Sequence, residues 1–155
     1  MTSTGRAPAT IALRRATEAD VPALVPLFGA YREFYRERRD PEAERTFLAA
    51  RLAAGEAVVF LAERGGAIAG FTLLYPSFSS VSLRPIYVLN DLFVVPTHRR
   101  QGVGAALLRA AVAFARERGA GYLTLETAKD NPAQRLYEAE GWRRDAEFLH
   151  YEHAV

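Results

Sequence analysis

A glycine-rich segment offers the clearest chemistry in this sequence. It reads Arg-Arg-Gln-Gly-Val-Gly-Ala over residues 99–105, between an apolar run typical of a buried strand and a stretch with helical periodicity. Glycines let a backbone approach a ligand closely, and the first N–H groups of a helix have no acceptor within that helix. With the helix dipole, these groups form a site for phosphate anions. We therefore expect this segment to bind an anion, and a pyrophosphate would fit.

Two other phosphate motifs fit the segment poorly. In the dinucleotide fingerprint Gly-x-Gly-x-x-Gly, Leu107 stands in place of the third glycine. Glu126 follows at about the distance of a ribose-binding acid, but the polar loop before Gly102 is too long for the tight turn of that fingerprint. A P-loop would need Gly-Lys-Ser/Thr, which the sequence lacks. A nucleotide-binding oxidoreductase is thus disfavoured, and a glycine-rich turn without a ligand remains the alternative.

A second motif supports the first. Residues 131–142 carry, in order, Asn131, Ala133, Leu136, Tyr137, Gly141 and Trp142. The N-terminal region adds Arg14, Ala16, Thr17 and Asp20. With Arg99, Gly102 and Gly104, these positions resemble the GNAT superfamily of N-acetyltransferases in order and separation, over about residues 11–152.

The resemblance implies a fold and a cosubstrate. The fold would be α/β (α+β), a single domain over residues 11–155 with a mixed central sheet flanked by helices. Its two central parallel strands would splay apart in a V that holds acetyl-CoA, with the pantetheine arm along the first strand and the pyrophosphate on the amides that follow. The residues implied for acetyl-CoA binding are Phe93, Val94, Val95, Arg99, Arg100, Gln101, Gly102, Val103, Gly104, Ala105 and Asn131.

Tyr137 and Asn131 each have a structural interpretation besides the functional one. Tyr137 shares a helical face with Leu136 and could belong to the core, but the matching tyrosine of the family protonates the departing CoA thiolate. Asn131 precedes Pro132, as a helix N-cap does, and by family position it also borders the cofactor. We predict catalysis for Tyr137 and a cap beside the cofactor for Asn131.

The acetyl acceptor needs a base, because a protonated alkylamine has a pKa near 10.4 and its deprotonation at pH 7 costs about 4 to 5 kcal/mol. The candidates for that base are Asp91, Glu126, Glu33 and Glu37. We predict Asp91, and a satisfied strand-end carboxylate is an equally good interpretation of it. The polyamine branch of the family has an acid where this chain has Asn90, so its base is not transferred directly. The residues expected around the acceptor are Tyr31, Glu33, Phe34, Tyr35, Phe78, Asn90 and Glu126, since aromatic rings and acids suit a cationic amine.

The sequence predicts alternating strands and helices, which must position the candidate site residues. Thr17 and Asp20 have capping-box spacing, Asp40-Pro41 begins a second helix, and Gly65-Gly66 fits a two-residue hairpin turn. The expected strands cover 11–15, 57–64, 67–75, 86–95 and 122–127, with a serine-rich loop over 77–82 placed at the acceptor cleft. The strands 86–95 and 122–127 should be parallel, joined by a right-handed helical crossover. A short helix should run from Asn131 to Gly141, and Trp142 with residues 148–153 should form a final strand that closes the sheet.

Composition narrows the class of protein. The 155 residues are 50% hydrophobic and 25% charged, which fits one globular domain, and we expect residues 1–10 to form a loose tail. A net charge of +2 is too small to indicate a nucleic-acid partner, and no apolar run is long enough for a membrane span. His150 and His153 lack a third ligand, so we expect no metal. The chain has no cysteine, which excludes an acyl-thiol enzyme intermediate.

The residues and the resemblance together predict a cytoplasmic, acetyl-CoA-dependent N-acetyltransferase. Acetyl transfer would occur by direct attack of a primary amine in a ternary complex, with a small molecule such as a polyamine or amino acid as acceptor. The alternatives are a protein lysine or N-terminal acetyltransferase and a non-catalytic acyl-CoA-binding module. A homodimer is the expected assembly, because two-fold dimers are the commonest closed oligomers and a C-terminal edge strand could pair across one.

Overall fold

The computed structural model describes residues 9–155, so the expected tail lies outside it apart from Ala9 and Thr10. The elements alternate much as expected. The strands are β1 (Ala12–Arg15), β2 (Val58–Arg64), β3 (Ala67–Ser79), β4 (Arg84–Val94) and β5 (Leu123–Thr124). The helices are α1 (Val21–Phe34), α2 (Pro41–Ala53), α3 (Val103–Glu117) and α4 (Gln134–Ala139), with 3-10 turns at Glu18–Asp20 and Pro96–His98.

The five described strands form one mixed sheet in the order β1-β2-β3-β4-β5. The first four are antiparallel to their neighbours, and β4 pairs with β5 in parallel. That last pairing covers only Tyr87 with Leu123 and Val88 with Thr124, so β4 continues to Val94 without β5 beside it. This divergence is the predicted V-shaped splay, and the predicted fold class is confirmed.

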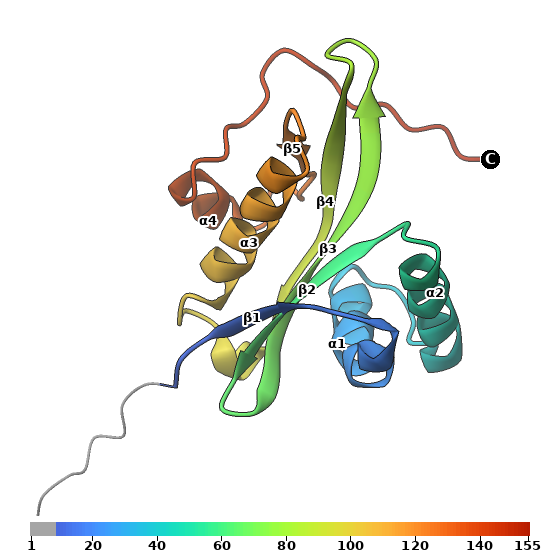
Figure 1. Ribbon diagram of the computed structural model, residues 1–155, viewed down its shortest axis with the longest axis vertical. Coiled ribbons are helices and arrows are strands. Elements are labelled where there is room, and N and C mark those ends of the chain that lie inside the picture. The colour runs from blue at the N-terminus through green and yellow to red at the C-terminus, as the bar shows by residue number, and fades with distance from the viewer. Residues whose placement is uncertain (1–8) are drawn as a thin grey trace, which may run out of the picture.

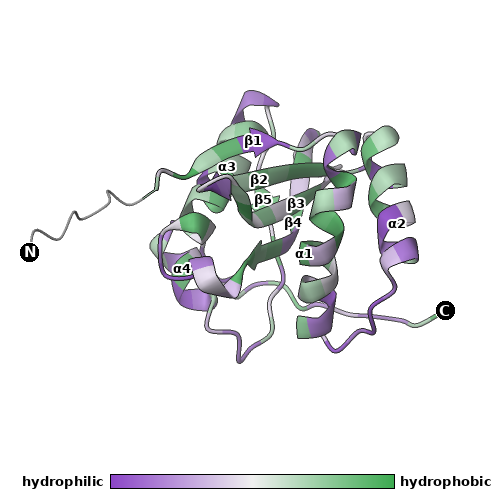
Figure 2. Cartoon of the chain, turned by 90° about the horizontal axis from the view of Figure 1, so that it is seen from below, coloured by the Kyte–Doolittle hydropathy of each residue, from purple (hydrophilic) through white to green (hydrophobic). Residues whose placement is uncertain are grey.

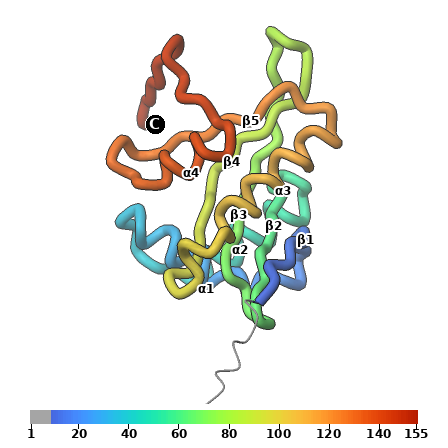
Figure 3. The backbone as a smooth tube through the Cα atoms, turned by 90° about the vertical axis from the view of Figure 1, so that its left-hand side faces the viewer, coloured from blue at the N-terminus to red at the C-terminus, as the bar shows by residue number. Residues whose placement is uncertain are grey.

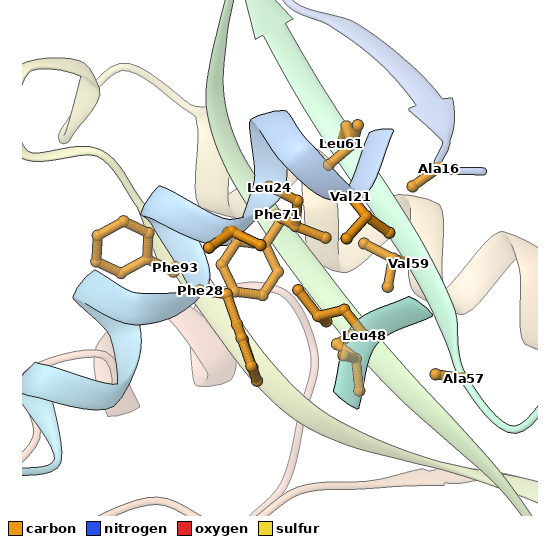
Figure 4. Packing of buried hydrophobic residues seen from close by; sticks show 12 residues of the cluster. Ala16, Val21, Leu24, Phe28, Leu48, Ala57, Val59, Leu61, Phe71 and Phe93 are labelled. Atoms are coloured by element: carbon orange, nitrogen blue, oxygen red, sulfur yellow. The ribbon is translucent and has the colours of Figure 1, made fainter. Parts of the chain in front are cut away.

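Helices cover both faces of the sheet (Figure 1). α1 and α2 lie on one face, and α3 and α4 lie on the other. The central strands are mostly hydrophobic, while the hydrophilic residues concentrate on the outer faces of the helices and in the loops (Figure 2). On the α1 and α2 face, Leu24, Phe28 and Leu48 point toward Phe71 of β3 (Figure 4). Burial of these side chains fixes α1 against β3 and β4, and α1 carries three of the residues predicted to contact the acceptor.

The local sequence signals act as expected. Thr17 and Asp20 form the capping box, with Asp20 Oδ2 accepting a hydrogen bond of 2.8 Å from the Thr17 amide. The Asp40 carboxylate caps α2 by accepting from the Ala43 amide at 3.1 Å. Gly65 and Gly66 both have positive φ, as the type I′ hairpin turn between β2 and β3 requires.

A close approach at Gly70 places the start of α3 on the sheet. A Cβ on this residue would lie 2.6 Å from the Phe93 carbonyl oxygen, 3.2 Å from Val103 and 3.3 Å from Leu107. Only glycine lets β4 and the first turns of α3 pack this closely on β3. The position of the predicted anion site therefore depends on a glycine in a different element.

Three expectations about strands were wrong in extent. β3 runs on to Ser79 and pairs with β4 to its end, so Ser77 and Ser79 belong to a projecting hairpin and not to a loop over the cleft. β5 has two residues instead of six. Residues 141–155 contain no strand, and Phe148, Leu149 and Tyr151 are exposed. A strand needs a partner edge, and strand propensity alone does not reveal whether one is in reach. Among the described residues no helix is long and apolar enough to cross a bilayer.

Candidate active site

A cleft of about 550 Å³ opens where β4 continues without β5. α3 and α4 border it from one face of the sheet, and the end of α1 borders it from the other (Figure 3). Fifteen of the twenty predicted site residues line it: Tyr31, Phe34, Tyr35, Asn90, Phe93, Val94, Arg99, Arg100, Gly102, Val103, Gly104, Ala105, Glu126, Asn131 and Tyr137. Segments far apart in the sequence thus meet in one cavity.

 The other five, Glu33, Phe78, Asp91, Val95 and Gln101, lie outside the lining.

The loop before α3 has the backbone conformation of an anion site. Arg100 and Gly102 both adopt positive φ, 58° and 84°, which turns the chain sharply into the first turn of α3. The amides of that turn have no acceptor within the helix, and the turn contains no acidic residue. Arg99 is held in place by a 3.0 Å hydrogen bond from its Nε to the Val94 carbonyl oxygen and lies over the Phe93 ring. Cationic side chains and unpaired amides at the cleft wall fit the pyrophosphate of a CoA thioester.

Gly104 has a packing role besides the one expected of it. A Cβ on Gly104 would lie 2.8 Å from Leu136 Cδ2 in α4 and 3.8 Å from Val94 Cγ2. The missing side chain therefore leaves room for α4 to pack on α3, in addition to leaving its own amide accessible. Asn131, whose Oδ1 accepts from the Ala133 amide at 2.9 Å, caps the turn that leads into α4. The regular helix begins three residues later, at Gln134.

Tyr137 lies on α4 at the cleft wall, where its ring is 6.3 Å from that of Trp142. Burial, reinforced by the nearby Tyr35, raises the pKa of Tyr137, and the Thr127 hydroxyl acts in the opposite direction. Thr127 Oγ1 is itself buried and has no hydrogen-bond partner at bonding distance within residues 9–155. A tyrosine with a raised pKa is fully protonated at neutral pH, so its hydroxyl is able to donate a proton.

The end of α1 forms an aromatic wall on the other side of the cleft. The Tyr35 ring is 5.0 Å from that of Tyr31 and 5.2 Å from that of Phe34, both edge to face. The Tyr31 hydroxyl donates a hydrogen bond of 2.9 Å to the Asn90 carbonyl oxygen. This bond joins α1 to β4 at Asn90, the extra residue where the β3–β4 register shifts. The irregularity turns Asn90 into the cleft and the next side chain, Asp91, away from it.

Asp91 lies directly behind this wall, only 2% exposed. Its Oδ1 accepts a 2.8 Å hydrogen bond from Asn90 Nδ2. Burial raises the pKa of the carboxyl to about 6, although Asn90 and the Tyr31 hydroxyl lower it. A carboxyl with a pKa near neutrality can hold or release a proton at physiological pH.

The other predicted residues outside the lining have identifiable roles or positions. Val95 packs in the core beneath α1, and Gln101 hydrogen bonds to Arg64 and to the Thr97 carbonyl oxygen. Glu33 faces away on the exposed side of α1, and Phe78 is 81% exposed on the projecting hairpin. Both were predicted because family position would place their segments over the acceptor cleft, and the position of a segment does not specify the face of a helix or the length of a hairpin. Glu126 does line the cleft, where His150 contacts it at 3.0 Å.

Sequence reasoning missed several lining residues. His98 and Arg135 add basic groups near the α3 end, and Leu89, Leu92, Leu125 and Leu136 add apolar surface. Arg135 carries a signal that could have been used, since it is a cation inside the second motif. Leu136 is itself a position of that motif, whereas Leu89, Leu92 and Leu125 carry no signal, because an apolar residue in an expected strand is indistinguishable from core until the strands are seen to separate.

Comparison with known proteins agrees with this geometry. The chain matches the model of the acetyltransferase (GNAT) family over residues 24–142. It is 49% identical to the uncharacterized N-acetyltransferase YhfO of Bacillus subtilis over 140 residues, which cover 90% of this chain and 94% of that protein. It is 32% identical to an aminoalkylphosphonate N-acetyltransferase of Salmonella typhimurium, covering 85% and 84% of the two chains. The crystal structure of a probable acetyltransferase superposes with a TM-score of 0.88 at 41% identity, covering 93% of this chain and 97% of that one. The chain therefore belongs to the GNAT family and is an acyltransferase.

Proposed function

We propose that this protein transfers the acetyl group of acetyl-CoA to a primary amine of a small molecule, by direct attack in a ternary complex. The observation that carries the proposal is that one cleft joins the start of α3, the Tyr137 hydroxyl and the aromatic wall of α1. A phosphate-binding end, a proton donor and an amine-binding end thus lie along one path. The absence of cysteine from the chain supports direct transfer.

The donor half of the site would be formed by α3, its preceding loop and β4. The amides from Arg100 to Ala105 would hold the pyrophosphate, with Arg99 adding positive charge. Beyond Val88, β4 has no β5 partner, so the backbone at Phe93 and Val94 borders the cleft and could pair with an amide-containing arm. This arrangement would place the thioester between α4 and the end of α1.

The transfer step needs one proton removed and one delivered. The amine nitrogen forms a bond to the acetyl carbon, the carbon–sulfur bond breaks, and the sulfur takes the Tyr137 proton. The proton lost by the amine would pass to Asp91. Because that carboxyl does not line the cleft, we propose that Tyr31, which does line it, relays the proton by turning its hydroxyl from the Asn90 carbonyl oxygen to Asp91. After the transfer, Asp91 would release its proton to solvent and Tyr137 would take one up from solvent.

The acceptor end favours a cationic amine. Tyr31, Phe34 and Tyr35 present aromatic rings, and a ring face stabilises an ammonium group by about 0.5 to 2 kcal/mol. Glu126 adds a carboxylate on the opposite side of the cleft. The aminoalkylphosphonate N-acetyltransferase relative, by its name, acts on a small amine, which supports a small-molecule acceptor here as well.

A panel of amines tests the proposal. Diamines, amino acids, monoamines, aminoalkylphosphonates and lysine-containing peptides would be compared at fixed acetyl-CoA by release of free CoA thiol, with kcat/KM as the measure. We expect small cationic amines to rank highest. Peptides that outperform every small amine would identify a protein acetyltransferase. If none of the amines causes release of CoA thiol, only the alternative of a non-catalytic acyl-CoA-binding module would be left.

We further propose that the protein forms a homodimer through its C-terminal segment. Phe148, Leu149 and Tyr151 are all about 80% exposed in an extended stretch, and β5 has a free edge beside the cleft. A second copy could supply the strand that the sheet lacks, burying these side chains in both chains. Sedimentation velocity should give a dimer that F148S/Y151S converts to a monomer, and a monomeric parent protein would contradict the proposal.

A further inference from the structure

One buried carboxylate organises the connection between α1 and α2. Glu44 of α2 is 2% exposed and accepts hydrogen bonds from Arg32 at 3.0 Å and from Arg39 at 3.1 to 3.3 Å. The Asp40 amide donates to the same carboxylate at 3.1 Å. Burial alone would raise the pKa of Glu44, but its hydrogen bonds with Arg39, the Asp40 amide and Arg32 keep the pKa below its ordinary value. The Glu44 carboxylate is therefore ionised and accepts hydrogen bonds from three separate residues.

The Arg39 guanidinium also packs against Gly29 of α1. A Cβ on Gly29 would lie 1.9 Å from Arg39 Nε and 2.1 Å from its Cζ, so the guanidinium lies directly on the glycine. Gly29 is in the middle of α1, where alanine would favour the helix more. The Arg39 guanidinium thus fills the space between α1 and Glu44, and any side chain on Gly29 would displace it.

The residues between the two helices have little other burial. Residues 35–43 are all exposed, and Arg36 has a positive φ of 64°. Arg32 links this segment to Glu44 a second time, because its Nη1 also donates to the Arg38 carbonyl oxygen at 2.9 Å. Tyr35, the first residue of this connector, belongs to the aromatic wall of the cleft.

We propose that Glu44, Arg32 and Arg39 are positioning residues for the amine acceptor. They hold the connector, residues 35–40, against α1 and α2, and thereby fix Phe34 and Tyr35 at the mouth of the cleft. The inference rests on the proposed function, because it assigns these aromatic residues to acceptor binding. The cluster lies on α1, α2 and their connector, on the face of the sheet opposite α3, so it should affect the acceptor and leave acetyl-CoA unaffected.

Single substitutions test whether the cluster affects binding of the amine acceptor and not binding of acetyl-CoA. We expect E44Q and R39A to raise the KM for the best amine by about tenfold, with kcat and the KM for acetyl-CoA changed by less than about twofold. R39K keeps the charge but loses the planar fork, so it should lie between R39A and the parent. R45A, at the exposed neighbour of Glu44, is the matched control and should behave as the parent does.

A double-mutant cycle separates positioning from stability. In the parent, G29A should raise the acceptor KM, because it displaces Arg39 from Glu44. In the R39A background, G29A should leave the KM unchanged and raise the melting temperature, since alanine favours the helix. Equal effects of G29A in both backgrounds, or an unchanged acceptor KM in E44Q, would overturn the proposal.

Hydrogen exchange gives a readout that does not depend on turnover. Amides of residues 35–40 should exchange faster in E44Q than in the parent and the R45A control. If no amine is acetylated by the parent, the proposed function fails, while exchange still decides whether the cluster holds the connector. If the parent is active and exchange of the connector is unchanged in E44Q, the positioning role is wrong and the proposed function stands.

Discussion

Gly104 in α3 and Leu136 in α4 are in such close contact that a Cβ on the glycine would lie 2.8 Å from Leu136 Cδ2. The contact joins the end of the cleft proposed to bind phosphate to the helix that carries Tyr137. Overpacking at such a site costs about 1 to 3 kcal/mol. A substitution at Gly104 therefore acts on α4 as well as on the anion site.

Coupling between these two residues should be measurable. We expect G104A to lower the free energy of unfolding and weaken acetyl-CoA binding, and L136A to be destabilising by cavity formation. The double variant should be more stable than the sum of the single effects predicts, because each change makes room for the other. Chemical denaturation and calorimetric titration with acetyl-CoA would measure both quantities, and additive effects would exclude the coupling.

Replacement of Tyr137 by phenylalanine should separate catalysis from packing. The ring and its contact with Trp142 are kept, so the melting temperature should change little. If the hydroxyl delivers the proton to the thiolate, kcat should fall by about 10²-fold or more. Y122F, at an exposed tyrosine, is the control. Near-normal turnover of Y137F with a good acceptor would leave Tyr137 as a packing residue.

Asp91 should show opposite effects on activity and stability. Its pKa is raised from 3.8 to about 6, so its contribution to stability is present below pH 3.8 and is lost as the pH rises through 6. The cost of the buried charge at pH 8 is about 3 kcal/mol. D91N should therefore be more stable than the parent at pH 8, and the difference should shrink toward pH 4.

The D91N variant also tests whether Asp91 is the general base. D91N should lower kcat/KM by about 10²-fold and remove the bend near pH 6 from the pH profile. Y31F should lower kcat/KM as well if Tyr31 relays the proton. A D91N protein with the parent's pH profile would show that Asp91 is a structural carboxyl, whatever its effect on stability.

The capping box of α1 should control acid stability. Hydrogen bonds from Arg14 and the Thr17 amide lower the pKa of Asp20 to about 2. The stability that this group contributes is present above its ordinary pKa of 3.8 and is lost as the pH falls toward 2. D20N should be up to about 1 kcal/mol less stable than the parent at pH 7, because the amide loses the ion pair with Arg14. Thermal unfolding at several pH values should show the two proteins converging between pH 4 and pH 2.

The sequence alone determined the elements that depend on neighbouring residues. The capping box at Thr17 and Asp20, the Asp40 cap and the Gly65-Gly66 turn were all predictable, because caps and tight turns are made by residues a few positions apart. The two motifs also contain about half of the cleft lining, since each is a continuous segment at the start of a helix.

Only the tertiary structure decided where the remaining groups lie. The register shift at Asn90 turns Asp91 out of the cleft, the long hairpin removes Phe78 from it, and the space at Gly104 belongs partly to Leu136. The Glu44 cluster joins residues that are up to 15 positions apart through two arginines that composition gave no reason to single out. Each of these outcomes depends on strand register or side-chain packing between separate elements, and such contacts have no signature in the local pattern of residues.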